Sequence, residues 1–486
     1  MTEAAEYGMH VAGAWTNGDR PRMEATSPAT GDVLGTVPEG TREDVRAAIA
    51  SAQGSWTAWA GLSPFERAAV MDRVAELIHE RREELARVLT LDQGKPLHAE
   101  SYGEVDELAE YFRMAGEDAK RLEGSLPPST DADKRILAYR VPRGVVGVIT
   151  PWNWPYTMPG ELIAPALASG NAVVWAPAPT TSVCAVELAR CIVDAGVPAG
   201  VFNMVTGRGP VVGDEIAANP GTTTVAFIGS IATGHKVAGR AAGKAQLLEM
   251  GGNGPVVVLD DAELEAAARA TLQSAFLCAG QSCTAGERWL VHRDIHDDFV
   301  ALVEAEVRAG VRLGDPLDAD TTMGPLNNEA TAAKMDRHIA DAVERGARLV
   351  AGGARARGFP TSLFYEPTVL DLVAHEMEVA REETFGPVVP VSVVSSEKEA
   401  LEVVNGSPYG LLASVWTRDL ARGVRFAEAA RCGWVNINES SNYWESHLPF
   451  GGRAGSASGV GRVGGRHPMD TFTELKTVVV NLGPRS

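Results

Sequence analysis

The stretch Gly280-Gln281-Ser282-Cys283-Thr284 places one cysteine among small and polar residues. A cysteine thiolate is a nucleophile that forms covalent intermediates, so Cys283 is a candidate catalytic residue. A free cysteine is more often a small apolar residue of the core. The chemical interpretation therefore depends on polar residues elsewhere, and the segments around Asn153, Glu249 and Glu383 are those that would support it.

The composition is that of an ordinary globular protein. The 486 residues are 45% hydrophobic and 22% charged, enough for two or three domains with large cores. The five cysteines are odd in number and show no CxxC or CxxxxH spacing, which predicts reduced thiols and no metal site. A formal net charge of −19 disfavours binding to nucleic acid or to anionic membrane surfaces. No run approaches the roughly 20 apolar residues of a membrane span, and the first residues do not have the pattern of an export signal, so we expect a cytoplasmic protein.

The chain before residue 142 supplies scaffold. Residues 25–40 mix β-favouring residues with Gly and Pro turns and predict short antiparallel strands. Thr41, with Asp44 three residues later, predicts a helix start, and residues 64–91 continue as amphipathic helices. Polar turns flank a short alternating strand in residues 122–141, which predicts an arm whose edge must be covered by another strand. The β-rich end of the chain is the candidate partner, contributed by a neighbouring subunit.

Residues 144–234 show the pattern of a doubly wound α/β fold. Unbroken apolar runs at 144–150 and 171–177 predict strands that are buried on both faces, with helices after them. A further strand at 223–228 leads directly into Gly229-Ser230 and a helix that contains Gly234. Strand, glycine turn and helix together direct backbone N–H groups at an anion such as phosphate, although such glycines often only tighten a turn. The turn lacks the GxGxxG spacing of the usual dinucleotide fingerprint.

Residues 251–430 alternate strands and helices again and predict a second α/β unit. Five segments of the chain resemble, in the same order, the signature motifs of the aldehyde dehydrogenase superfamily. They are Pro151-Trp152-Asn153-Trp154-Pro155, Leu248-Glu249-Met250-Gly251-Gly252, Gly280-Gln281-Ser282-Cys283, Glu383-Thr384-Phe385-Gly386-Pro387 and Pro449-Phe450-Gly451-Gly452. The likeness covers nearly the whole chain, and Glu249 precedes Cys283 by 34 residues (283 − 249), the separation typical of the hydrolytic members.

The resemblance implies a fold and an activity. The fold is α/β, with a Rossmann-like dinucleotide-binding domain in residues 1–121 and 142–250 and an α/β catalytic domain in residues 251–468. A small β oligomerisation arm is formed by residues 122–141 and 469–486, which predicts a homodimer or homotetramer. The activity is the oxidation of a small-molecule aldehyde to a carboxylic acid by NAD(P)+.

The resemblance also implies roles for three residues. The thiolate of Cys283 adds to the carbonyl carbon, and the resulting oxyanion is stabilised by the Asn153 amide and the backbone N–H of the cysteine. Loss of hydride leaves a thioester, which water hydrolyses with Glu249 as the general base. Members of the family that pass the acyl group to coenzyme A lack this glutamate, so water is the predicted acceptor.

The expected cofactor is NAD, with NADP as the alternative. The resemblance places the nucleotide against Ile149, Thr150, Pro151, Trp152, Gly229, Ser230, Gly234, Met250, Glu383 and Phe385. Where most members carry a Lys-Pro segment followed by Glu, this chain has Ala176 and Pro179. Ala176 cannot bond a ribose hydroxyl, whereas Pro179 removes a carboxylate that would repel a ribose phosphate. These two differences point in opposite directions, and the nucleotide preference stays open.

The substrate tunnel is predicted to be lined by Trp154, Met158, Leu277, Ser282, Trp444 and Phe450, with Thr157, Glu161, Asn442, Tyr443 and His447 beside them. This set has no obvious arginine, which disfavours a dicarboxylic semialdehyde. The main alternative function is that of a cysteine hydrolase in which His292 or His296 is the base for Cys283. A non-catalytic binding role is the other alternative, but it leaves Cys283, Asn153 and Glu249 unexplained.

Overall fold

Five parallel strands form the centre of the first of two large sheets. They are β7 (Val145–Ile149), β8 (Ala172–Ala176), β9 (Phe202–Met204), β10 (Thr224–Gly229) and β11 (Ala245–Met250), and they lie in the order β9-β8-β7-β10-β11. Their apolar runs are buried on both faces, as the sequence predicts. The direction of winding reverses between β7 and β10, and in open α/β sheets ligands bind at the carboxyl ends of the strands beside such a reversal.

Three short strands extend this sheet through antiparallel pairings. β2 (Met9–Val11) and β3 (Ala14–Thr16) lie at one edge, and β19 (Gly459–Val460) lies at the other. β19 returns from near the end of the chain to pair with Leu248 and Glu249 of β11. A separate small sheet contains β1 (Ala5–Glu6), β5 (Val33–Pro38) and β4 (Arg22–Thr26), and the antiparallel pairing of β4 with β5 confirms the prediction for residues 25–40.

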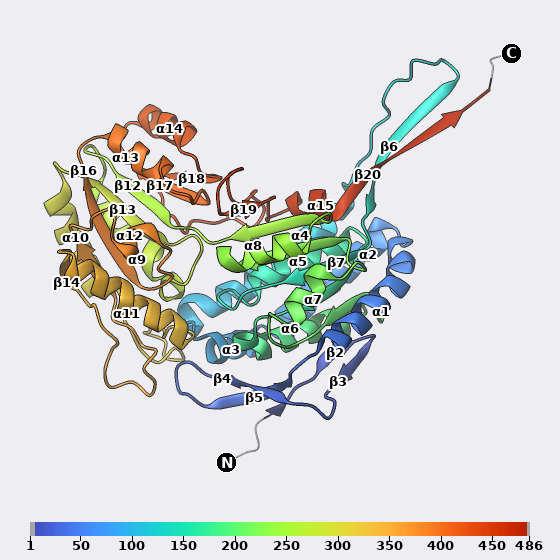
Figure 1. Cartoon of the computed structure of the whole chain (residues 1–486), viewed down its shortest axis with the longest axis horizontal. Coiled ribbons are helices and arrows are strands. Elements are labelled where there is room, and N and C mark those ends of the chain that lie inside the picture. Colours follow the sequence, from blue (N-terminus) through green and yellow to red (C-terminus); the bar gives the residue numbers. More distant parts are fainter. Residues whose placement is uncertain (1–4, 484–486) are drawn as a thin grey trace.

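Helices surround the first sheet (Figure 1). α1 (Arg42–Ala60) begins with the predicted capping box between Thr41 and Asp44, and α2 (Pro64–Glu80) and α3 (Arg82–Gln93) follow. A single π-helical turn, η1 (Leu97–Ser101), leads into α4 (Tyr102–Ala119), which packs against α2 and α5. The remaining helices of this part are α5 (Thr157–Ala168), η2 (Pro179–Thr181), α6 (Ser182–Asp194), α7 (Val212–Ala218) and α8 (Ile231–Arg240).

The second large sheet has seven strands, all parallel except the edge strand β14. In spatial order they are β14 (Arg348–Ala351), β15 (Thr368–Asp371), β16 (Val388–Val394), β13 (Gly286–His292), β12 (Gly254–Val258), β17 (Leu412–Trp416) and β18 (Trp434–Ile437). Its helices are α9 (Leu264–Phe276), η3 (Leu277–Gly280), α10 (His296–Gly310), α11 (Glu329–Glu344), α12 (Glu378–Arg381), α13 (Glu397–Asn405) and α14 (Leu420–Ala429). The α/β fold class predicted from the sequence is confirmed.

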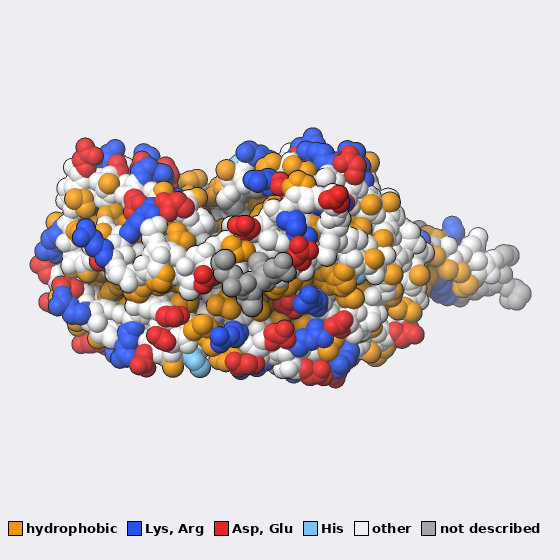
Figure 2. All heavy atoms as spheres, turned by 90° about the horizontal axis from the view of Figure 1, so that it is seen from below, with side chains coloured by type: hydrophobic (Ala, Val, Ile, Leu, Met, Phe, Trp, Pro, Cys, Tyr) orange, Lys and Arg blue, Asp and Glu red, His pale blue; other side chains and the backbone are white. Residues whose placement is uncertain are grey.

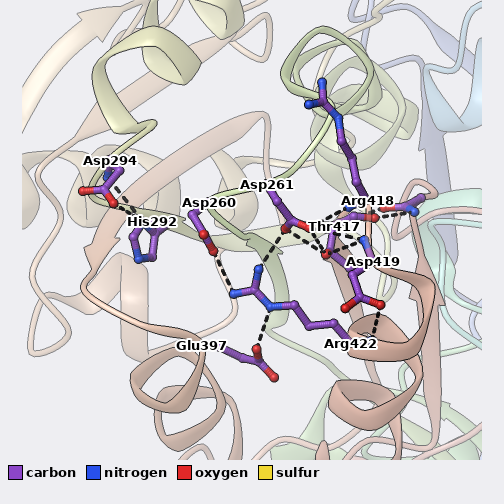
Figure 3. Close-up of polar contacts among 10 residues, drawn as sticks. Asp260, Asp261, His292, Asp294, Glu397, Thr417, Arg418, Asp419 and Arg422 are labelled. Atoms are coloured by element: carbon purple, nitrogen blue, oxygen red, sulfur yellow. Dashed lines mark hydrogen bonds and ion pairs between the residues drawn. The ribbon is translucent and has the colours of Figure 1, made fainter.

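The carboxyl edge of the second sheet is occupied by ion pairs (Figure 3). The guanidinium of Arg422 bonds to Asp260, Asp261 and Glu397 at 2.7–2.9 Å, and Asp261 also accepts a hydrogen bond from Thr417. These residues follow β12, β16 and β17, so the crevice where an α/β sheet commonly binds ligands is filled by the protein's own side chains. The opposite, amino edge of this sheet is the one that turns toward the first sheet.

The arm consists of two long antiparallel strands that project from the body of the molecule (Figure 1). β6 (Lys134–Pro142) pairs over its whole length with β20 (Thr473–Asn481), which follows α15 (His467–Phe472). The prediction that the end of the chain pairs with the arm of a neighbouring subunit is therefore wrong, because Leu137 pairs with Val478 of the same chain. Apolar side chains remain exposed on this ribbon, and Figure 2 shows them where the arm leaves the main surface. They include Leu475, Val479 and Leu482.

The computed structural model describes residues 5–483. Residues 1–4 and 484–486, which the predicted domain and arm ranges include, lie outside the described part. Within residues 5–483, no helix is both long and apolar enough to cross a bilayer, and no group of three or more His, Cys, Asp or Glu side chains is placed to hold a metal ion.

Candidate active site

Two cavities of about 640 Å³ each meet at Cys283. The first, the apolar cavity, is lined by aromatic side chains from loops of both large sheets. The second, the polar cavity, lies at the carboxyl ends of β7 and β10. Cys283, Glu249 and Met158 line both cavities. Cys283 is thus placed where a molecule bound in one cavity would touch a molecule bound in the other.

The turn before Cys283 has an unusual backbone. Cys278, Ala279 and Gly280 follow one another with φ values of 53°, 51° and 72°, in the left-handed region. A Cβ atom on Gly280 would lie 2.1 Å from the carbonyl oxygen of Gly386, so the close approach of these two segments requires glycine. Left-handed conformations at two non-glycine residues cost about 1–3 kcal/mol each and need support from their surroundings.

Buried polar groups provide this support. The carboxylate of Glu100 accepts the backbone N–H of Cys278 at 3.0 Å, and Gln281 donates its side-chain amide to the Cys278 carbonyl at 2.8 Å. The Gln281 side chain also accepts the backbone N–H of Asn327 at 2.9 Å. The turn that presents Cys283 is thereby attached to η1 and to the segment before α11.

Asn153 is buried in the loop between β7 and α5. Its Nδ2 atom donates to the carbonyl oxygen of Gln281 at 2.9 Å. An amide nitrogen carries two N–H groups, so this bond orients the side chain and leaves a second donor. The carboxylate of Glu104 fixes the following residues by accepting the N–H groups of Tyr156 and Thr157, and Glu104 itself pairs with buried Lys95 at 2.5 Å.

Glu249 lies near the end of β11 and is buried beside Cys283. Its carboxyl group is hydrogen-bonded to the thiol, whereas Oε1 has no protein partner within residues 5–483. Burial, with a smaller contribution from Glu383, raises the pKa of Glu249 to about 8. Burial and the nearby Glu249 carboxyl also raise the pKa of the Cys283 thiol. At low pH the Glu249 carboxyl and the Cys283 thiol are therefore both protonated and neutral.

The polar cavity has the features that a dinucleotide requires. Gly229 and Ser230 line it, and the first turn of α8 after Ser230 has no side-chain cap, so its backbone N–H groups are open to an anion. Gly234 allows α8 to pack on Met250, because a Cβ there would lie 2.0 Å from the Met250 sulfur. Lys334 adds a positive charge to the lining.

The opposite wall of this cavity is formed by Glu383 and Phe385. The Glu383 carboxylate accepts the N–H of Gly252 at 2.9 Å, and the Phe385 ring lies edge-on to Trp152 with centroids 5.6 Å apart. Phe385 has a φ of 60°, and this backbone is held by the carboxylate of Glu287, which accepts the N–H groups of Thr384 and Phe385 at 2.7 and 2.6 Å. Sequence reasoning missed Glu287 and Lys334, because neither lies in a motif.

The predicted nucleotide residues divide into two groups in the structure. Pro151, Trp152, Gly229, Ser230, Glu383 and Phe385 line the polar cavity. Ile149, Thr150, Gly234 and Met250 lie behind this lining, where Thr150 accepts a hydrogen bond from the Trp175 indole at 2.9 Å. Ala176 pairs with Ile149 at the carboxyl end of β8, beside the same loops.

The apolar cavity contains every residue predicted for the substrate tunnel: Trp154, Met158, Leu277, Ser282, Trp444 and Phe450. Thr157, Glu161 and Asn442 also line it, whereas Tyr443 and His447 line a surface hollow outside it. Glu107, Thr284 and Val463 were missed. No histidine of the described residues lines either cavity, and His296 is bonded to Asp371 at 2.7 Å, so the structure does not bring the bases of the hydrolase alternative to Cys283.

A doubly wound sheet whose glycine turn faces a half-buried cysteine and a buried glutamate is the arrangement expected of an NAD(P)-dependent dehydrogenase. The model of the aldehyde dehydrogenase family matches residues 15–478, and the chain belongs to that family. It is similar to succinate-semialdehyde dehydrogenase (NADP(+)) GabD of Escherichia coli (strain K12), with 39% identity over 97% of both chains. It is also 37% identical to betaine aldehyde dehydrogenase of Bacillus subtilis (strain 168) over 98% of both chains.

Solved structures agree. Succinate-semialdehyde dehydrogenase from Burkholderia pseudomallei superposes with a TM-score of 0.95 at 38% identity, covering 98% of each chain. Betaine aldehyde dehydrogenase from Staphylococcus aureus in complex with NAD+ gives a TM-score of 0.95 at 32% identity, covering 100% of this chain and 96% of that one. The protein is thus an NAD(P)-dependent aldehyde dehydrogenase that oxidises an aldehyde to a carboxylic acid, as the motifs predicted.

Proposed function

We propose that Cys283 is the nucleophile, Asn153 the oxyanion donor and Glu249 the general base of this oxidation. The observation that carries the proposal is the position of Cys283 and Glu249 at the junction of the two cavities. A substrate in the apolar cavity and a nicotinamide in the polar cavity would then meet at the sulfur. Holding the two reactants in this orientation lowers the reaction barrier, because the entropy of bringing them together is lost on binding and not in the reaction step.

The first step is addition of sulfur to the aldehyde. Glu249 takes the thiol proton, and the Cys283 sulfur forms a bond to the carbonyl carbon while the carbonyl π electrons move to oxygen. The free N–H of the Asn153 amide and the backbone N–H of Cys283 donate to the resulting oxyanion. Because Asn153 is already oriented by Gln281, no reorganisation is needed when the charge develops.

The nucleotide is held, in this proposal, by Ser230, the first turn of α8, Lys334 and Glu383, with Trp152 and Phe385 beside the ring. When bound, its nicotinamide supplies the hydride acceptor. The relatives include both an enzyme named for NADP(+) and one solved with NAD+, and we propose NAD with NADP as the alternative.

The second step is hydrolysis of the thioester on Cys283. After Glu249 has released the thiol proton to solvent, its unpartnered Oε1 atom accepts a proton from water, and the oxygen of that water attacks the acyl carbon. The carbon–sulfur bond breaks, the carboxylic acid leaves and the thiolate is restored. The reaction is tested with a panel of aldehydes and NAD or NADP, by following absorbance of the reduced nicotinamide. Failure with every combination would refute the proposal, and nucleotide-independent turnover would favour a hydrolase.

Asn153→Ala is expected to lower kcat/KM by about 10²- to 10³-fold, because one of two oxyanion donors is lost. The nucleotide Kd should change little, since the nucleotide-binding turn is on β10 and α8. Steady-state kinetics with circular dichroism as a folding check measure the effect. A loss of less than about threefold would remove Asn153 from the oxyanion site.

The rate should depend on pH through Glu249. Burial raises the pKa of this carboxyl to about 8, and only the ionised form takes a proton. kcat is therefore expected to rise between about pH 7 and pH 9, with its midpoint near pH 8, and to level off above about pH 9. A profile that is flat over this range would contradict the assignment of the base.

Further proposals concern the whole chain. We infer that residues 1–121 and 142–250 bind the nucleotide, that residues 251–468 carry the catalytic cysteine, and that the arm of residues 122–141 and 469–486 joins subunits into a dimer or tetramer. Exposed Leu475, Val479 and Leu482 on the arm support this assembly, because isolated ribbons rarely leave such side chains in water. Light scattering of the wild type and of Val479→Lys tests it. A cytoplasmic location is proposed from the sequence.

A further inference from the structure

Two carboxyl groups of the apolar cavity have no part in the proposed chemistry. Glu107 of α4 and Glu161 of α5 both line this cavity together with Glu249. Glu161 is buried and Glu107 is half-buried. Carboxyl groups withdrawn from water are rare without a cationic partner, since fully removing the charge from water costs several kcal/mol or about 3–5 pKa units. Their position in a substrate cavity therefore calls for an explanation from the ligand.

The protein supplies these two groups with neutral hydrogen bonds only. Glu161 accepts from the Tyr111 hydroxyl at 2.7 Å, and Glu107 accepts from the Thr157 hydroxyl at 3.0 Å. No lysine, arginine or histidine of the described residues lines the cavity. Lys95 acts on Glu107 from outside the cavity, but it is bonded to Glu104 and lies over the Trp154 ring, so its charge is already compensated.

Aromatic rings form the rest of this wall. The Trp444 indole donates to the Tyr111 hydroxyl at 3.1 Å, and its ring lies edge-on to Phe450 with centroids 4.9 Å apart. Trp154 completes the set on the side of the catalytic loop. Indole faces attract cations by about 0.5–2 kcal/mol, and they do not compensate a carboxylate.

The entrance to the cavity is also lined by acidic side chains. Glu107 also lines the surface hollow outside, together with Glu110 and Glu445. Glu110 pairs with Arg113, and Glu445 accepts the Tyr443 hydroxyl and lies 3.5 Å from His447. Within residues 5–483, Glu107 has no ion pair. In a protein of net charge −19, the potential at this mouth attracts cations and repels anions.

We propose that the substrate is an aldehyde bearing a positively charged nitrogen, seated between the Glu107 and Glu161 carboxyls and the Trp444 ring. This inference rests on the proposed function and names its substrate class. The relatives do not decide the matter, because their names include both succinate semialdehyde and betaine aldehyde. A substrate carboxylate in this cavity would face two glutamates and no cation. Burial raises the pKa of Glu161 well above its usual range, so the negative charge that a bound cation meets is that of Glu107.

The Glu107 carboxyl should titrate within the working range of the enzyme. Burial raises its pKa to about 7, with Glu104 raising it and Lys95 lowering it, and Glu161 and Glu249 are the other acids of the same cavity. A bound cation favours the ionised form, so affinity for a cation increases as pH rises through about 7. A neutral aldehyde gains nothing from this ionisation. The pH dependence that ionisation of Glu249 gives to both reactions cancels in the ratio of the two kcat/KM values.

The test uses two aldehydes of the same shape. Trimethylammonioacetaldehyde and tert-butylacetaldehyde differ only by nitrogen in place of carbon, and succinate semialdehyde provides the anionic comparison. We expect kcat/KM for the cation to exceed that for the neutral aldehyde by about 10- to 100-fold, and this ratio to increase between about pH 6 and pH 8. A ratio of one or less, or a preference for succinate semialdehyde, would overturn the inference.

A variant and a control locate the effect. Glu107→Gln should lower the ratio of cation to neutral kcat/KM by about tenfold and abolish its pH dependence. Glu117→Gln removes the same charge from α4 at a site paired with Lys120, and the ratio should stay at the wild-type value. An unchanged ratio in Glu107→Gln would also overturn the inference. If that variant fails to fold, the wild-type ratios still decide. Absence of oxidation with every aldehyde would refute the proposed function instead.

Discussion

Replacing Cys283 by alanine is expected to reduce aldehyde oxidation by at least about 10⁴-fold. The reason is that no other side chain at the junction of the two cavities can form the covalent intermediate. Among the described residues, Cys278 is nearby but buried, and burial raises the pKa of its thiol to about 12. It therefore cannot replace the missing thiolate at neutral pH.

The same variant should bind the nucleotide almost as the wild type does. The polar cavity is formed mainly by the turns after β7 and β10 and by Glu383, and the mutation removes one sulfur atom at its end. Quenching of tryptophan fluorescence by the nucleotide measures this, since Trp152 lines the cavity. Cys432→Ala is the matched control, because Cys432 lines neither cavity and should keep full activity. Normal turnover in Cys283→Ala would show the assignment to be wrong.

The sequence was sufficient to predict the class of fold and the convergence of the motifs. Unbroken apolar runs identify the parallel strands, and the loops after β7 and β10 carry Asn153 and Ser230 to the edge where the winding reverses. The amino edge of the second sheet brings Cys283 to the same place, because the cysteine directly precedes β13. Strand order thus explains why segments more than a hundred residues apart line one pair of cavities.

Other parts of the structure have no local signal. The arm strand could pair with any extended segment, and a hydrophobic pattern does not tell whether that segment belongs to the same chain, which is why the pairing of Leu137 with Val478 was not predicted. Glu107 was missed because a glutamate on an amphipathic helix has the pattern of a solvated residue. Tyr443 and His447 were placed in the tunnel by proximity to Trp444, but the whole loop lines the surface hollow and only Asn442 and Trp444 also reach the apolar cavity.

Backbone support of the catalytic turn was equally hidden. Glu100 lies in η1, about 180 residues from Cys278, and only the fold brings its carboxylate to the Cys278 N–H. Glu287 holds the backbone of Phe385 in the same way from β13. These carboxylates compensate strained turns that carry functional residues, so they are needed for geometry and do not appear in any chemical motif.

Glu249→Gln is expected to separate the two halves of the reaction. Glutamine keeps the size of the side chain but cannot take a proton. The thiol of Cys283 then loses its proton to solvent, so the thioester should form and, without a base for water, persist. A single burst of reduced nucleotide, near one equivalent of enzyme, should precede a steady rate lowered by about 10²- to 10⁴-fold. Stopped-flow absorbance measures the burst, and mass spectrometry of the quenched enzyme measures the acyl group on Cys283.

The rate of the burst in Glu249→Gln tests whether this carboxyl also takes the proton of the Cys283 thiol. In the resting enzyme Glu249 is hydrogen-bonded to the thiol and raises the pKa of Cys283. Removing its negative charge should make the thiolate easier to form, while removing its basicity leaves solvent as the only proton acceptor. If Glu249 acts chiefly on water, the burst rate at about pH 9 should remain within about tenfold of the wild type and only the steady rate should fall. An unchanged steady rate would exclude Glu249 from hydrolysis, and loss of both phases would assign it to activation of Cys283 instead.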